Sequence, residues 1–378
     1  MKFLRDLQDR QAKLFEKGGR LEMFYPLYEA NDTFLFTPPD VTRGPSHVRD
    51  GLDLKRMMIT VVVALLGCMF MACYNTGYQA FIAIANGAAP LDNWQTALYE
   101  FTGLSYRPGN FVGAFIYGAL YYVPMYIVTV AVGGAIEAIF AIVRKHEINE
   151  GFLVTSALFP LTLAPLTPLW QVALGIAFGV FIGKEIFGGV GMNFLNPALV
   201  GRAFLFFAYP GQLSGDQVWI AAETSPDTYS GATLLAQAYY GSPDASGSLS
   251  GLKALQESGF SWWDAFYGLI PGSIGETSAL FCLIGGIIII YTGVGSWRVI
   301  AGCLLGSFAM VGVFNIVGSD TNPFFDVPFY WHWVLGSFAF AVVYMATDPV
   351  SASFTLLGKW VYGFFIGVLG ILIRVINP

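Results

Sequence analysis

Charged side chains are scarce over most of this sequence. They make up 12% of its 378 residues, whereas soluble domains carry about 25%. Ten of the 19 lysines and arginines precede Met57, which leaves nine for the rest of the chain. Six stretches of 21 residues or more contain no Asp, Glu, Lys or Arg: 57–91, 108–136, 151–183, 277–297, 299–319 and 327–347. A bilayer-spanning helix needs about 20 apolar residues, and a soluble core would not repeat this pattern six times without polar faces.

Cysteine and histidine are also rare, and neither forms a recognisable site. The four cysteines lie inside apolar stretches with no metal-ligand spacing, so we interpret them as buried thiols lining helices. No cluster of His, Cys and Asp has metal spacing, and no phosphate-binding or dinucleotide-binding glycine motif is present. Residues 1–20 mix acids and bases, which argues against an arm that binds nucleic acid or anionic lipid, and they lack a cleavable signal.

The apolar pattern predicts an all-α polytopic membrane protein with about nine transmembrane helices. Residues 1–56 form a polar N-terminal segment. The segment 151–168 contains three prolines, so we expect a broken or re-entrant helix there, which is tolerated when buried in protein or lining a cavity. The predicted spans are 57–78, 110–143 (kinked at Pro124 or at Gly133-Gly134), 151–168, 169–186, 193–210, 278–296, 298–318, 330–347 and 356–376.

The positions of lysine and arginine predict the orientation of the chain. Two long connections, 79–109 and 211–276, contain only Arg107 and Lys253 and are expected outside, in the periplasm of a bacterium. The N-terminal segment is then cytoplasmic and the membrane is the inner membrane. The opposite, cytoplasmic loops hold the other basic residues between spans, namely Lys55, Arg56, Arg144, Lys145, Lys184, Arg298 and Lys359.

Nine spans leave the C-terminus outside, directly after a span edge, which suggests a tenth helix beyond Pro378. Ten spans divide into two inverted sets of five, as in many transporters and channels. Asn196-Pro197 and Asp348-Pro349, each at a span edge, hint at such a repeat. We therefore divide the chain into a first transmembrane half (57–210), an external loop (211–276) and a second transmembrane half (277–378) that lacks its last helix.

The external loop contains the sequence Ser230-Gly231-Ala232-Thr233. By itself this is a small-residue turn. Its threonine hydroxyl is nevertheless accessible to a modifying enzyme, and Gly231 and Ala232 let the backbone approach a phosphate closely. A phosphoester with a flavin nucleotide is one modification that such a site permits.

With that motif, the chain resembles the family of membrane proteins that includes NqrB of the Na⁺-translocating NADH:quinone oxidoreductase (Nqr) and RnfD of the Rnf complex. The resemblance extends over nearly the whole length, and the long N-terminal segment with FYPLYEANDTFLFTPP favours Nqr. It is carried by SHVRD (46–50), RKHEINEGF (144–152), FGGVGMNFLNPALVGRAFLF (187–206), PGSIGE (271–276), GSDTN (318–322) and MATDPVSASF (345–354).

The resemblance implies a respiratory subunit that passes electrons through flavins to ubiquinone and couples them to export of Na⁺ or H⁺. It implies FMN esterified to Thr233, a non-covalent riboflavin, and ubiquinone as substrate. The implied partners are an NADH, FAD and 2Fe-2S subunit, a second covalent-FMN subunit, small membrane subunits, a cytoplasmic subunit and a flavin transferase. NADH would bind another subunit, since no nucleotide motif occurs here.

A second group of residues lies near the cytoplasmic end of the long span 110–143. Gly133 and Gly134 permit close approach of a helix or ligand, and an acid inside a span, Glu137, is a functional candidate. The resemblance places this stretch beside the quinone and inhibitor pocket, with Phe152 helping to line it. The alternative is a helix-end glutamate near Arg144 and Lys145.

Two further polar groups are candidate flavin contacts. Asn193, Asn196, Arg202 and Asp348 must pair with each other or with a ligand near lipid, and we expect riboflavin among them; helix capping alone is the alternative. Ser273, Gly275 and Glu276 precede the sixth span on the same side as Thr233, so this turn could face the FMN as an anion-binding nest. A plain turn with a helix cap is the alternative there.

Two other functions compete with the Nqr-type interpretation. An Rnf-type ferredoxin:NAD oxidoreductase subunit would carry the same flavin ester without a quinone site. A non-redox channel or transporter would have the same bundle without flavin. Covalent flavin in the denatured chain distinguishes the channel or transporter, which would lack it, from the Nqr-type and Rnf-type subunits, which would carry it.

Overall fold

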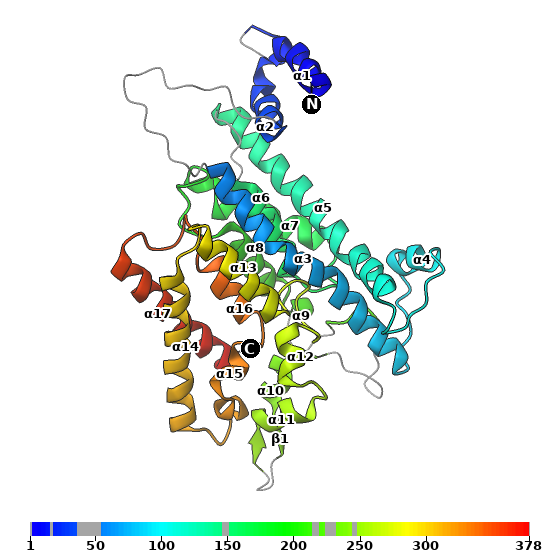
Figure 1. The fold of residues 1–378 in the computed structure, drawn as a ribbon, viewed down its shortest axis with the longest axis vertical. Coiled ribbons are helices and arrows are strands. Elements are labelled where there is room, and N and C mark those ends of the chain that lie inside the picture. The colour runs from blue at the N-terminus through cyan, green and yellow to red at the C-terminus, as the bar shows by residue number, and fades with distance from the viewer. Residues whose placement is uncertain are drawn as a thin grey trace.

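The computed structural model describes residues 2–15, 18–35, 54–145, 151–213, 219–223, 232–243 and 248–377. This part of the chain is predominantly helical, as Figure 1 shows. The strands in it are β1 (Ser242–Pro243) and β2 (Leu249–Ser250), which pair antiparallel. The all-α polytopic fold class is confirmed.

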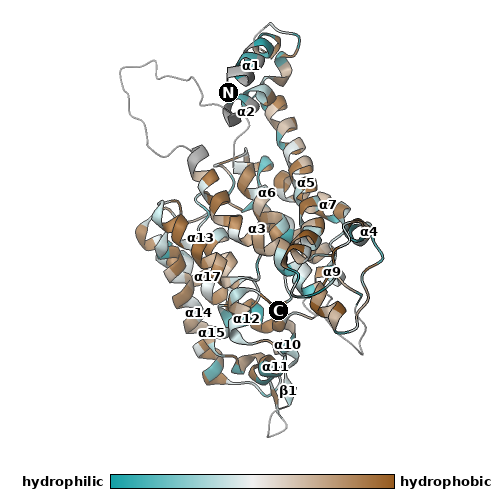
Figure 2. Ribbon diagram, turned by 45° about the vertical axis from the view of Figure 1, so that its right-hand side comes forward, coloured by the Kyte–Doolittle hydropathy of each residue, from teal (hydrophilic) through white to brown (hydrophobic). Residues whose placement is uncertain are grey.

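Within the described part of the chain, five helices are long and apolar enough to cross a membrane. Figure 2 shows apolar residues predominating along them. They match five predicted spans, and the second runs as one helix through Pro124. Their bounds are α3 (Leu54–Ala85), α5 (Phe111–Arg144), α7 (Leu169–Gly183), which continues as the short 3-10 helix η2 (Glu185–Phe187), α14 (Trp297–Val317) and α17 (Leu356–Ile376).

Three predicted spans form shorter apolar helices: α6 (Gly151–Leu161), α8 (Pro197–Ala208) and α13 (Ala279–Tyr291). The proline-rich segment breaks as predicted, because α6 ends after Pro160 and α7 begins after Pro168. The carbonyl oxygens of Leu161 and Leu163 accept hydrogen bonds from the amides of Gly275 and Ile274, at 2.9 and 3.0 Å. The turn before α13 therefore satisfies backbone groups that the break leaves free.

The prediction of a continuous helix over 330–347 is wrong. The segment forms α15 (Phe329–His332), α16 (Phe338–Phe340) and a π-helical turn, η4 (Ala341–Met345). Gly336 and Ser337 adopt φ of 51° and 59°, which ends the helix between α15 and α16. The guanidinium of Arg374, in α17, donates to the carbonyl oxygens of His332 and Gly336 at 2.8 and 2.7 Å. A charged donor thus compensates for the lost helical hydrogen bonds.

Two helix pairs pack with their backbones in direct contact. A Cβ at Gly118 of α5 would collide with the Cys73 carbonyl oxygen of α3, and one at Gly306 of α14 with the Phe364 carbonyl oxygen of α17. Small residues at these crossings permit the close approach that stabilises helix pairs in lipid. The largest buried cluster joins α3, α5, α6, α7, α8, α13 and η4, while a second one gathers around α14 and α17.

Two groups of short elements outside the bundle lie near opposite ends of the molecule (Figure 1). The N-terminal elements α1 (Lys2–Phe15), η1 (Glu22–Phe24) and α2 (Tyr25–Leu35) lie at one end, and α10 (Leu234–Tyr240), α11 (Gly251–Glu257) and α12 (Trp262–Tyr267) lie near the other. Their location on opposite sides of a membrane stays a prediction. The remaining short helices are α4 (Trp94–Glu100), α9 (Pro210–Leu213) and η3 (Pro323–Asp326).

Candidate functional site

Thr233 lines a cavity of about 160 Å³. We call it the Thr233 cavity. Its polar lining comes from Arg202 of α8, from Ser273 and Glu276 in the turn before α13, and from Ser337 at the break before α16. The structure therefore brings three of the predicted flavin-contact residues, Thr233, Ser273 and Glu276, to one place. Segments distant in sequence converge here: the break at Gly336 and Ser337 lines the cavity directly, and the turn before α13 lines it while bonding to the end of α6.

Thr233 begins the short helix α10. Its Oγ1 accepts a hydrogen bond from the amide of Ala236 at 3.2 Å, which makes it the helix cap. Gln237 donates from Nε2 to the carbonyl oxygen of Ala232 at 3.0 Å and fixes the residue before it. Ala232 and Thr233 are half-buried, and Ser230 and Gly231 lie outside the described residues.

The turn that carries Ser273 and Glu276 is held from two sides. Asn75, buried in α3, donates from Nδ2 to the carbonyl oxygen of Ile270 at 2.9 Å. Gly275 packs on the end of α6, where a Cβ would collide with the Leu161 side chain. Gly275 thus serves packing and does not line the cavity, whereas its neighbour Glu276 does.

Arg202 and Glu276 give the Thr233 cavity its charge. The Nη1 atom of Arg202 is buried and has no hydrogen-bond partner in the described part of the chain. Burial raises the pKa of Glu276 to about 7, against the opposing effects of Ser273, Arg202 and Ser337. Arg202 was expected beside Asn193 and Asn196; the structure places it here instead.

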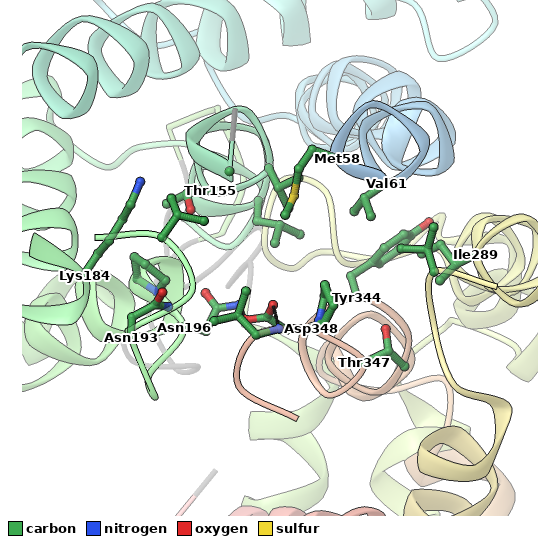
Figure 3. Close-up of a pocket in the computed structure, with 18 residues that line it drawn as sticks. Met58, Val61, Thr155, Lys184, Asn193, Asn196, Ile289, Tyr344, Thr347 and Asp348 are labelled. Carbon is green, nitrogen blue, oxygen red and sulfur yellow. Dashed lines mark hydrogen bonds between the residues drawn. The ribbon is translucent and has the colours of Figure 1, made fainter. Parts of the chain in front are cut away.

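Asn193, Asn196 and Asp348 line a second cavity, the Asp348 cavity, shown in Figure 3. Asn196 donates from Nδ2 to Oδ2 of Asp348 at 3.4 Å, so the two halves of the chain meet there. Asn196 also caps α8, because its Oδ1 accepts from the Ala198 amide at 3.0 Å. Asp348 begins no helix, and its Oδ1 accepts from the Val350 amide at 3.1 Å within a turn. Pairing and capping, posed as alternatives, therefore occur together at Asn196.

The Asp348 cavity has a volume of about 60 Å³. Small-molecule pockets range from about 300 to 1,000 Å³. A riboflavin ring therefore does not fit between Asn193, Asn196 and Asp348 with the side chains as they stand. The polar groups suit its edge, but the space does not.

The two broken elements connect the two cavities. In α6, Thr155 lines the Asp348 cavity, and the far end of the helix binds the turn that lines the Thr233 cavity. In the second broken element, Ser337 lines the Thr233 cavity and Tyr344 lines the Asp348 cavity. Phe340, fully buried, lies between these two residues in the chain.

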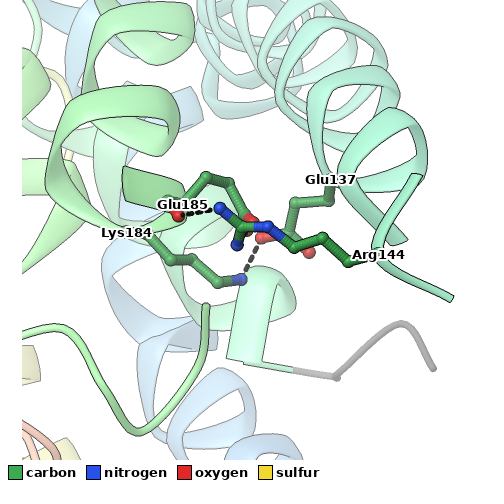
Figure 4. Close-up of polar contacts among 4 residues, drawn as sticks. All are labelled: Glu137, Arg144, Lys184 and Glu185. Carbon is green, nitrogen blue, oxygen red and sulfur yellow. Dashed lines mark hydrogen bonds and ion pairs between the residues drawn. The ribbon is translucent and has the colours of Figure 1, made fainter. Parts of the chain in front are cut away.

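The residues predicted to bind quinone make two separate sets of contacts. The ring of Phe152 packs on Gly133 and Gly134, where an added Cβ would lie 2.5 and 3.5 Å from ring carbons. Glu137, one helical turn further along α5, forms an ion pair with Lys184 (Figure 4). Both side chains are buried, so Glu137 is not a solvated helix-end residue. Arg144 donates from Nη2 to the carbonyl oxygen of Glu185 at 2.8 Å and completes a cluster of four charges.

Comparison with known proteins identifies the family. The family described as NQR2, RnfD, RnfE matches residues 41–378. The chain belongs to this family. It is 52% identical over 375 residues to NqrB of the Na(+)-translocating NADH-quinone reductase from Chromohalobacter salexigens, covering 99% of this chain and 88% of that protein. The corresponding proteins of Azotobacter vinelandii and Klebsiella pneumoniae are each 53% identical, over 99% of this chain and 90% and 91% of theirs.

This membership confirms the family resemblance that the motifs suggested. Within the described residues, no group of three or more His, Cys, Asp and Glu side chains has a metal-binding arrangement. Sequence reasoning missed Lys184 as the partner of Glu137. It also missed Asn75, which holds the turn before α13, and Arg374, which donates to the carbonyl oxygens at the break between α15 and α16. In each case the sequence shows a polar residue within or beside an apolar span, which marks the residue as noteworthy but does not identify its partner.

Proposed function

We propose that this chain is the NqrB membrane component of a Na⁺-translocating NADH:quinone oxidoreductase. Relatives with that assignment are 52–53% identical over 99% of the chain. In this proposal the subunit passes electrons from a partner that oxidises NADH to ubiquinone, and ion export is coupled to that transfer. It works in the bacterial inner membrane, with residues 1–56 in the cytoplasm and the Thr233 loop in the periplasm.

The observation that carries the flavin part of the proposal is the Thr233 cavity. A hydroxyl at a helix start faces a space bounded by a cationic side chain and two serines. The phosphate end of FMN needs a hydroxyl for its ester and a positive charge beside it, and both are present. The volume of about 160 Å³ suits the phosphate and ribityl part, because whole small-molecule pockets begin near 300 Å³.

The side chains of the cavity have separate tasks in this proposal. Thr233 holds the ester, Arg202 and Ser273 bind polar oxygens, and the apolar walls from Leu234 and Leu335 exclude water. The bound flavin supplies the electron-transfer chemistry, which no side chain here provides. The protein contributes position and electrostatic environment.

The quinone head is proposed to bind beside Gly133, Gly134 and Phe152, near Glu137. Phe152 gives an aromatic face and Glu137 a polar group that suits the quinone oxygens. Riboflavin is proposed at Asn193, Asn196 and Asp348, where side chains must move to admit it. If the coupled ion crosses this bundle, Glu137 and Asp348 are the candidate acids.

In-gel flavin fluorescence tests the proposed function. The chain is expressed with its partner subunits and flavin transferase, and the denatured chain is examined on a gel. We expect fluorescence in the wild type and a complete loss in Thr233→Ala. We expect no change in Thr228→Ala, which removes another threonine hydroxyl from the same predicted loop. A wild-type chain without fluorescence contradicts the electron-carrier function, and loss only in Thr228→Ala moves the ester to that residue.

A further inference from the structure

Arg202 has a buried nitrogen without a partner. Its Nη1 atom is shielded from solvent and makes no hydrogen bond to any described residue. The side chain lines the Thr233 cavity, and it is the only basic one among the described residues that do so. A buried guanidinium nitrogen left without an acceptor is costly, because it loses its hydration and gains nothing in return.

Glu276 does not fully neutralise the positive charge of Arg202. It lines the same cavity and acts on Arg202 through its charge. Burial raises the pKa of Glu276 to about 7, so near neutral pH part of the population carries no charge there. The cavity then holds a cation with no full counter-charge, which favours an anion as its occupant.

We propose that Arg202 binds the phosphate of the flavin ester on Thr233 and that Glu276 opposes it, so that the two residues set the redox potential of that flavin. This inference rests on the proposed function, since it requires the ester. A phosphodiester carries one negative charge, and the planar guanidinium donates to phosphate oxygens in pairs. Reduction adds negative charge to the flavin, so a nearby cation favours the reduced form and a nearby carboxylate disfavours it.

The two residues therefore have opposite expected effects. Arg202→Gln removes the cation and lowers the midpoint potential of the flavin. Glu276→Gln removes the carboxylate and raises it. A role in packing alone does not produce shifts of opposite sign. Arg202→Lys keeps the charge but loses the paired donors, so its potential should lie between those of the wild type and Arg202→Gln.

The experiment uses the purified, flavin-loaded complex in a spectroelectrochemical titration. The component that disappears in Thr233→Ala identifies the relevant flavin among the others. Covalent loading is measured separately by in-gel fluorescence per chain. Lys253→Gln is the matched control, because it removes a positive charge on the same predicted side, from a side chain that is 37% exposed and paired with Glu257.

At a fixed potential and at a pH above about 8, where Glu276 is ionised, we expect the oxidised-to-reduced ratio of this flavin to rise at least threefold in Arg202→Gln and to fall at least threefold in Glu276→Gln. Lys253→Gln should leave it unchanged. If Arg202→Gln fails to assemble, Arg202→Lys and Glu276→Gln still decide the matter. Unchanged ratios in these variants, or shifts of the same sign, overturn the inference while leaving the ester in place. An unlabelled wild-type chain overturns the proposed function instead.

Discussion

The ammonium group of Lys184 forms an ion pair with the carboxylate of Glu137 inside the helical bundle. The two side chains are only 4% and 5% exposed. The pair joins α5 to the residue that follows α7, and Figure 4 shows the amine facing the carboxylate. The stem of Lys184 also lines the Asp348 cavity, where Figure 3 shows its nitrogen directed away from Asp348. One side chain thus lies between two candidate sites.

Lys184→Met should destabilise the protein strongly. The substitution leaves the Glu137 carboxylate buried without its cation, and removing one partner of a buried pair costs about 3–5 kcal/mol. The melting temperature of the purified complex in detergent, followed by tryptophan fluorescence, measures the effect. The double variant Lys184→Met/Glu137→Gln should recover most of the loss, because no charge is left unpaired.

The pair Lys253–Glu257 provides the control for this prediction. Its atoms are 3.5 Å apart and its side chains are 37% and 54% exposed. Exposed pairs contribute about 0.2–1 kcal/mol, so Lys253→Met should change the melting temperature little. Equal effects of the two lysine substitutions would show that the Glu137 pair is solvated and would contradict its burial.

Gly133 and Gly134 should respond differently to alanine. At Gly133 the new methyl group would lie 2.5 Å from the Phe152 ring, whereas at Gly134 the distance is 3.5 Å, an ordinary contact. Gly133→Ala must therefore displace Phe152, and Gly134→Ala need not. We expect Gly133→Ala to raise the KM for ubiquinone several-fold and to weaken binding of a quinone-site inhibitor, with a smaller change in Gly134→Ala.

The matched observation for this prediction is the rate of NADH oxidation by an artificial acceptor that bypasses the quinone. It should stay at the wild-type level in both variants if only the quinone pocket is altered. A wild-type KM and inhibitor affinity in Gly133→Ala, with the protein stably folded, would remove Phe152 from the proposed pocket.

The apolar stretches of the sequence were sufficient to predict most of the long helices of the bundle. The helices α3, α5 and α14 follow from windows free of charge, because each window is long enough to cross a bilayer. The helix α17 follows from an apolar run with a basic residue near each end, Lys359 and Arg374. The break near Pro160 was also predictable, since proline removes a backbone donor. The break at Gly336 and Ser337 was not, because its cause lies elsewhere: Arg374 supplies the donors that make an interrupted helix tolerable.

The residues of the candidate sites were also only partly predictable from the sequence. Thr233, Ser273 and Glu276 were assigned to one site from motif and predicted sidedness, and they do line one cavity. Arg202 was grouped with Asn196 and Asp348 as a polar residue at the edge of a predicted span, but the helix α8 carries it to the Thr233 cavity instead. Lys184 was used only for orientation, because nothing in the sequence of α7 indicates a partner in α5.

Arg374→Met should destabilise the second half of the bundle. Arg374 donates to the His332 and Gly336 carbonyl oxygens, and hydrogen bonds from charged donors contribute about 1.5–3 kcal/mol each. The apolar replacement leaves both carbonyls without these donors in an apolar environment. We expect a melting temperature several degrees lower, with Arg374→Lys intermediate because it retains the charge but not the planar fork.

Arg298 provides the comparison for this change. It also lies in a long apolar helix, at the start of α14, with its guanidinium 5.0 Å from the Trp297 ring centroid. Arg298→Met removes one cation–π contact worth about 0.5–1 kcal/mol at exposed sites. A drop as large as that of Arg374→Met would mean that the carbonyl hydrogen bonds of Arg374 do not account for its effect.

Glu276 should make stability depend on pH in a defined direction. Burial raises its pKa to about 7, whereas an unfolded glutamate titrates near 4.3. Between these values the folded protein binds more protons than the unfolded chain, so stability falls as the pH rises through this window. Among the described residues lining the cavity, Arg202 is the other charged group, and it opposes the shift.

The measurement is best made in a Thr233→Ala background, because a flavin phosphate would add a second charge to the cavity. At about pH 4, below the pKa of an unfolded glutamate, the Glu276→Gln and parent proteins should melt together, since residue 276 is then mostly neutral in the folded and the unfolded chain. At about pH 8 the parent should melt a few degrees lower, because it alone carries a buried carboxylate. Glu257→Gln, which removes an exposed carboxylate, should leave the difference between the two pH values unaltered. A parent protein that does not lose stability relative to Glu276→Gln between these pH values would show that Arg202 keeps Glu276 ionised in the folded protein, with a pKa no higher than in the unfolded chain. The cavity would then contain a neutral ion pair with no preference for an anion.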